Sequence, residues 1–70
     1  MEKQIKNWML QENKNEYLQI GCVDNYNATL LAESASAYFE FENGDDNDAL
    51  CFEIAIDVIE KWRNESWKRN

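Results

Sequence analysis

One segment near the C-terminus constrains this chain more than any other feature, because a helix drawn through it is apolar around most of its circumference. Its apolar positions are Cys51, Phe52, Ile54, Ala55, Ile56, Val58, Ile59 and Trp62. A narrow polar stripe completes the helical wheel and consists of Glu53, Asp57, Glu60, Lys61 and Asn64. Such a helix is stable only when other segments cover it on several sides. We therefore expect the rest of the chain, or a second copy of it, to pack around this segment.

The scarcity of helix breakers favours an all-α fold. The 70 residues contain no proline and only two glycines, whereas folds built from many short strands need frequent turn residues. A chain of this length forms one domain, which we take to span residues 1–70. We predict a small three-helix bundle with helices over roughly residues 2–12, 28–41 and 47–67. The last and longest helix is expected at the centre of the bundle.

The sequence pattern indicates the first helix clearly but leaves the connection after it undecided. Ile5, Trp8 and Met9 recur at helical spacing and share one face, which indicates a helix. The six residues from Glu16 to Gly21 also contain apolar side chains. Periodicity over six residues does not separate a short turn of helix from an extended link, so both interpretations stay open.

The second helix carries signals at both of its expected ends. Asn25 or Asn27 can cap its start by accepting hydrogen bonds from free backbone N–H groups, and Asn43 with Gly44 can end it. Small side chains on its predicted inner face would let another helix approach closely. This inner face consists of Ala28, Leu31, Ala32, Ala35, Tyr38 and Phe39.

Three aspartates, Asp45, Asp46 and Asp48, precede the apolar segment and raise the question of a metal site. A calcium-binding EF-hand loop needs oxygen ligands at alternating positions, a glycine at the sixth and a glutamate at the twelfth. Here Gly44 precedes the acids, and apolar residues 49–50 occupy ligand positions. Aspartate at a helix N-terminus is favoured by the helix dipole and by free N–H groups. We therefore expect Asp46 or Asp48 to cap the last helix, and we expect no metal to bind.

The distribution of charge restricts the partners of this chain. The net charge is −7, and no lysine or arginine lies between Lys14 and Lys61. The acids in this interval are Glu16, Asp24, Glu33, Glu40, Glu42, Asp45, Asp46, Asp48, Glu53, Asp57 and Glu60. So acidic a body repels phosphate, which disfavours direct binding of nucleic acid and of anionic membranes. A basic protein partner is compatible with it, and so is a charge that serves only to keep the protein dispersed.

Several residues and motifs that commonly support catalysis are missing, and carboxylates such as Glu40 and Glu42 are more often a solvated face than an acid–base pair. The chain has no histidine and no glycine-rich phosphate loop, and its two cysteines are Cys22 and Cys51. Without a histidine, neither a serine nor a cysteine has its usual activating base. Cys51 falls among apolar neighbours, where a cysteine is usually a small buried hydrophobe. We expect a non-enzyme without cofactors, located in the cytoplasm, where thiols stay reduced.

Two functional hypotheses are compatible with this surface. The first is a protein-interaction module that binds a basic partner, or a second copy of itself as a homodimer. The second is a nucleic-acid mimic that occupies the cationic groove of a DNA- or RNA-binding protein. The candidate partner contacts are Glu40, Glu42, Asp45, Asp46, Asp57 and Trp67. For Trp67, an exposed anchor for a partner competes with a frayed helix end or a ring folded back onto a neighbour.

The order of segments also shows a resemblance. The stretches NEYLQIG and LLAESASAYF, an acidic turn, and then ALCFEIAIDVIE follow one another between residues 15 and 60. In this order the chain resembles short, uncharacterised acidic helical proteins of bacterial genomes and mobile elements. That group has no established activity, so the resemblance implies a bacterial origin and no particular function.

Overall fold

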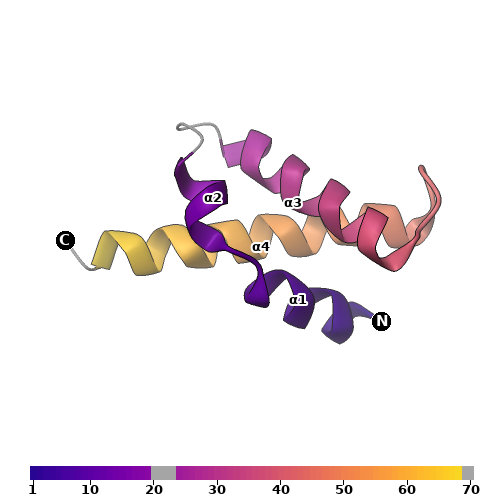
Figure 1. Ribbon diagram of the computed structural model, residues 1–70, viewed down its shortest axis with the longest axis horizontal. Helices are drawn as coiled ribbons and strands as arrows, with labels where there is room; N and C mark the ends of the chain where they lie inside the picture. Colours follow the sequence, from indigo (N-terminus) through magenta and orange to yellow (C-terminus); the bar gives the residue numbers. More distant parts are fainter. Residues whose placement is uncertain (20–23, 69–70) are drawn as a thin grey trace.

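The computed structural model describes residues 1–19 and 24–68, and the regular elements in these ranges are all helices (Figure 1). In chain order they are α1 (Glu2–Gln11), α2 (Lys14–Gln19), α3 (Asp24–Phe39) and α4 (Asp46–Lys68). The prediction of an all-α fold is confirmed. The expectations for Gly21 and Cys22 lie outside the described residues.

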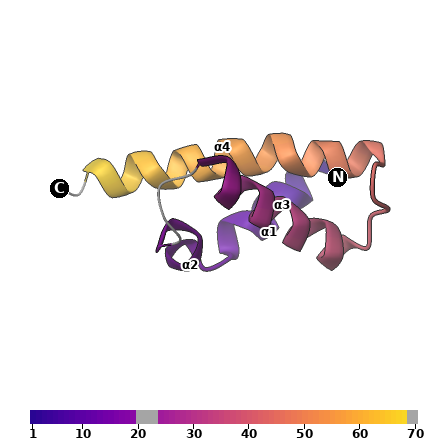
Figure 2. The ribbon, with the colours of Figure 1, turned by 90° about the horizontal axis from the view of Figure 1, so that it is seen from above.

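Helix α4 runs along the long axis of the molecule and contacts each of the other three helices. In Figure 1, α3 and α1 lie on opposite sides of α4, whereas Figure 2 shows α3 and most of α1 together on one side of it. Helix α4 therefore packs against the pair formed by α1 and α3. The molecule measures 39 × 21 × 16 Å, and its length follows from α4, whose 23 residues span about 34 Å at the helical rise.

The connection that the sequence left open contains a short helix, α2. Asn13 makes this helix possible, because its Oδ1 atom accepts a hydrogen bond of 3.1 Å from the backbone N–H of Asn15. Its carbonyl oxygen accepts a second bond from the N–H of Glu16 at 3.1 Å. An asparagine in the N-cap position satisfies donors that would otherwise lack a partner, so a helix starts here despite its few apolar residues.

Helix α3 begins earlier than the sequence predicted, at Asp24 instead of residue 28. Asn27 is therefore not its cap. It lies within the first turn, is fully buried, and its side-chain amide makes no hydrogen bond to any described residue. Asn25 is also helical, although its side chain lies outside the described part. The start predicted at residue 28 was wrong because residues 24–27 contain no glycine or proline to stop the helix.

Helix α3 also ends earlier than predicted, at Phe39, and Asn43 and Gly44 lie in the following turn. Glu40 adopts the left-handed conformation, with φ of 60°. The N–H of Phe41 donates to the carbonyl of Ser36 at 2.9 Å, and the N–H of Glu40 donates to the carbonyl of Ala37 at 3.3 Å. These bonds form a Schellman motif, which closes a helix by satisfying its last carbonyls. A glutamate stands where glycine is usual.

The core lies where the inner faces of α1, α3 and α4 meet. It consists of Ile5, Met9, Ala28, Leu31, Ala32, Ala35, Cys51, Ile54, Ala55, Val58, Ile59 and Trp62. Six of the eight apolar side chains predicted on the last helix are thus buried within a single chain. Of the other two, Phe52 is half-buried and Ile56 is exposed. The chain covers most of its most apolar helix without a second copy.

Ile59 and Ile56 provide a matched test of this packing, since they lie on the same helix with 2% and 45% of their surface exposed. We expect Ile59→Ala to lower the free energy of unfolding by about 3 kcal/mol, through lost burial and a cavity. Ile56→Ala should change it by no more than about 0.5 kcal/mol, as exposed substitutions do. Urea unfolding followed by circular dichroism measures both. Equal losses, or a loss that depends on protein concentration, would mean that another chain covers Ile56.

Glu40 provides a test of the helix end. Replacing it with glycine removes the steric cost of the left-handed conformation, although glycine also makes the unfolded chain more flexible. We expect Glu40→Gly to raise the free energy of unfolding by about 0.5 kcal/mol. The control Glu40→Gln keeps the steric cost and removes only the charge. A glycine variant less stable than the glutamine variant would contradict the Schellman geometry.

Candidate interaction surface

The structure brings four of the predicted contact residues together in the turn between α3 and α4. The side chains of Glu40, Glu42, Asp45 and Asp46 are all exposed. None of them forms an ion pair with a residue in the described part of the chain. Because Gly44 has a φ of +85° in open surroundings, the chain reverses here without crowding. The result is an acidic end of the molecule, which we call the acidic turn (residues 40–46).

The aspartates next to this turn hold it together, with roles different from those predicted. Asp45 stands immediately before the first residue of α4, and its Oδ1 atom accepts a bond of 2.7 Å from the N–H of Asp46. Asp48 Oδ2 accepts a bond of 3.2 Å from the N–H of Gly44, and Asp48 Oδ1 accepts one of 2.7 Å from the Ser36 hydroxyl. The prediction of Asp46 or Asp48 as the cap was wrong by one position. Asp45 occupies the N-cap, while Asp48 ties α4 to α3.

These hydrogen bonds occupy carboxylate oxygens that a metal ion would otherwise need as ligands. Among the described side chains, no three from acidic residues or cysteines are placed to hold a metal. Asp48 directs both of its carboxylate oxygens to protein donors, and the side chain of Asp46 is exposed. Asp45 therefore stands at the start of a helix, and Asp48 stabilises the turn before it.

Asp57 and Trp67 lie apart from the acidic turn, on α4. Asp57 is exposed on the outer face of the helix with Glu53 and Glu60, which places three acids in one row along the axis. It follows Asp46 by eleven residues, or about 16 Å of helix. The backbone of Trp67 lies in the last turn of α4, but its side chain is outside the described part. The structure therefore does not join these two residues to the turn.

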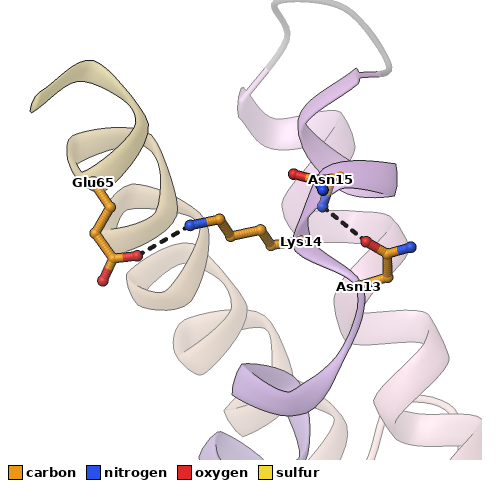
Figure 3. A network of polar contacts seen from close by, with 4 residues as sticks. All are labelled: Asn13, Lys14, Asn15 and Glu65. Carbon is orange, nitrogen blue, oxygen red and sulfur yellow. Dashed lines mark hydrogen bonds and ion pairs between the residues drawn. The ribbon is translucent and has the colours of Figure 1, made fainter. Parts of the chain in front are cut away.

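At the far end of α4, an ion pair neutralises one acid. Lys14 Nζ on α2 lies 3.3 Å from Glu65 Oε2 on α4 (Figure 3). Both side chains are partly exposed, so the pair contributes no more than about 1 kcal/mol to stability. Figure 3 also shows the bond between Asn15 and Asn13 that starts α2. The acids of the acidic turn, at the other end of α4, form no such pair with a described residue.

An aromatic cluster next to the acidic turn was missed in the sequence. The Tyr38 ring stacks on the Trp8 ring of α1 with centroids 5.0 Å apart and meets the Phe39 ring edge-on at 5.0 Å. Phe39 stacks in turn on Phe41 at 5.6 Å. Tyr38 was predicted on the buried face of its helix, yet 63% of its surface is exposed. Its position at the edge of that face was the only signal, and the wheel does not reveal that Trp8 lies beside it.

Cys51 is fully buried, as its apolar neighbours predicted. Burial raises the pKa of its thiol, and the nearby carboxylate of Asp48 acts in the same direction, whereas a hydrogen bond with Ser36 lowers it. A thiol with a raised pKa forms little of the reactive thiolate. The cysteine therefore contributes packing to the core.

No helix in the described part of the chain combines the length and the apolar character that crossing a bilayer requires. Comparison of the chain with protein-family models, with curated proteins and with solved structures found no match of any of the three kinds. The resemblance to acidic helical proteins of bacteria stays a prediction.

The raised pKa of Cys51 predicts a pH dependence of stability. The unfolded chain loses this thiol proton near the ordinary value of 9.0, while the folded chain holds it to higher pH. The contribution of the thiol to stability is therefore complete below about pH 9 and is lost as the pH rises through the folded pKa. We expect the difference in unfolding free energy between a Cys22→Ser chain and a Cys22→Ser, Cys51→Ala chain to shrink between pH 8 and pH 10.5. Urea unfolding at each pH measures it, and a constant difference would contradict the shift.

Proposed function

We propose that this protein is a non-catalytic, cytoplasmic interaction module whose acidic surface binds a basic protein partner. The acidic turn supports this proposal most directly. It presents four exposed carboxylates that no base in the described part of the chain neutralises. Complementary charge accelerates encounter with a basic partner and excludes acidic ones.

The helices supply a scaffold for such a surface. We propose that α1, α3 and α4 act as a three-helix bundle with α4 at its centre, which the contacts of α4 with every other helix support. The acidic turn is held on this scaffold by the Schellman motif after Phe39 and by Asp48, which bonds to both Ser36 and Gly44. A surface fixed in this way loses little conformational entropy when a partner binds.

A non-catalytic role agrees with the chemistry of the side chains. The chain contains no histidine, and the described cysteine, Cys51, is buried with a raised pKa. General acid–base or nucleophilic catalysis needs a group whose pKa is tuned near neutral pH and that is open to substrate. The exposed acids of the turn have solvent around them, so binding is the function that they suit best.

The nucleic-acid mimic is the second candidate. The row of Glu53, Asp57 and Glu60 favours it, since three carboxylates follow one line as phosphates do on one strand. Its steps of about 6 Å and 4.5 Å along the axis are wider than the roughly 3.4 Å between the phosphates of one strand. A duplex presents two such rows. On the outer face of α3, Glu33 has no second exposed acid one turn away among the described residues. One row supports a mimic less well than two would.

A salt-dependent capture experiment tests the proposal. The immobilised full chain should retain basic proteins from a bacterial lysate at 50 mM salt and release them at 500 mM, with a loss on the order of ten-fold. A chain carrying Glu40→Gln, Glu42→Gln and Asp46→Asn should retain much less. The matched control carries Glu2→Gln, Glu12→Gln and Glu33→Gln, which remove the same charge elsewhere.

The outcomes of this experiment differ between the candidate functions. Release of the captured proteins by competitor DNA would favour the mimic. Retention at high salt would favour an apolar interface, including a homodimer, which sedimentation of the free chain detects. Equal capture by both triply substituted chains would show that the acidic turn is not the binding surface.

A further inference from the structure

We propose that the aromatic cluster and the acidic turn form one docking site for an arginine-bearing peptide segment of the partner. We call this the Trp8–Tyr38 site, and it consists of Trp8, Tyr38, Phe41, Glu40 and Glu42. The inference rests on the proposed function and deepens it, because it names the surface and the chemistry that the surface would recognise.

The exposed ring of Tyr38 is held in place before any partner arrives. Trp8 stacks on it with an interplanar angle of 27°, and Phe39 meets its edge at 87°. Nevertheless, Tyr38 is the most exposed of the large apolar side chains in the described part of the chain. Aromatic side chains that are partly exposed and held rigid are common anchors of protein interfaces, because they add contact area at little cost in conformational entropy. A ring whose only role was to fill the core would be buried, whereas the Tyr38 ring is mostly exposed.

The charge next to this ring is negative and fixed in position. Glu40 and Glu42 follow Tyr38 within four residues, and both are exposed. The Schellman motif fixes the backbone of Glu40, and the negative end of the α3 dipole lies at the same place. The lysines of α1, Lys3 and Lys6, lie roughly 140° to 160° around their helix from Trp8. They are therefore on the other side of α1.

Arginine fits this combination better than other groups do. Its planar guanidinium stacks on an aromatic face and can form paired hydrogen bonds with a carboxylate at the same time. Lysine is a compact charge that lacks this planar fit. Phosphate groups are repelled by the two glutamates, and a second copy of the chain, with its net charge of −7, would bring like charges together. The site therefore favours a segment of a basic protein.

The test uses two synthetic peptides as probes with the full chain. One is a capped nonapeptide with four arginines separated by glycine and serine, and the other has lysine at the same four positions. We expect the arginine peptide to bind about five-fold more tightly at 50 mM salt, as a cation–π contact implies. Titration followed by amide and indole NMR shifts measures both affinities. The largest shifts should fall on the Trp8 indole and on residues 38–42.

Substitutions separate the ring from the charge. Tyr38→Leu should remove the preference for the arginine peptide, whereas Tyr38→Phe, which keeps the ring, should retain it. Glu40→Gln with Glu42→Gln should weaken the binding of both peptides, and Glu33→Gln on the outer face of α3 serves as the control. Because Tyr38 is mostly exposed, these chains should fold, which circular dichroism checks. If Tyr38→Leu does not fold, the comparison of the two peptides on the unsubstituted chain still decides.

Two results would overturn the inference in different ways. Equal affinity for the two peptides, with shifts spread over the acids of α4, would contradict the Trp8–Tyr38 site and leave the proposed acidic binding module intact. Binding of neither peptide to the unsubstituted chain would contradict both. An unchanged arginine preference in a folded Tyr38→Leu chain would place the recognition elsewhere.

Discussion

The whole structure depends on the burial of one apolar helix. Helix α4 exposes too much apolar surface to stand alone, and a chain of 70 residues has few segments with which to cover it. Helix α3 covers one side of α4, and its buried residues Ala28, Ala32 and Ala35 are small enough to let the two helices lie close together. Ile5 and Met9 of α1 cover the neighbouring side. The burial of six α4 side chains in one chain follows from this arrangement.

The same constraint explains why the acids gather where they do. Apolar side chains occupy the inner faces of the helices, so charge is confined to the outer faces and to the turn between α3 and α4. In that turn the chain reverses so that α4 can pack against α3. Asp45 accepts a hydrogen bond at the start of α4, and Asp48 links α4 to the turn and to α3. Part of the acidic character is therefore structural. Glu40, Glu42 and Asp46 take part in the hydrogen bonds of the turn through their backbones only, which is why their carboxylates are the better candidates for binding.

The Trp8–Tyr38 contact shows how a surface arises from packing. Once α1 and α3 lie on the same side of α4, two aromatic side chains at the edges of their helices meet 5.0 Å apart. Neither ring is fully covered, since Trp8 is half-buried and Tyr38 is mostly exposed. The acidic turn begins directly after this ring in the sequence. A rigid aromatic surface and a fixed negative charge are thereby joined at one end of the molecule.

The sequence by itself determined the helical class, the long last helix and most of the core, because these depend on periodicity and on the absence of breakers. It also determined the net charge, the interval without bases and the lack of a histidine. Only the folded structure decided the helix ends, because three neighbouring aspartates suit an N-cap equally well and a glutamate such as Glu40 is not a residue that usually ends a helix. Only it decided the exposure of Tyr38, since whether a side chain at the edge of a helical face is covered depends on the neighbouring helix, which no single-helix pattern contains.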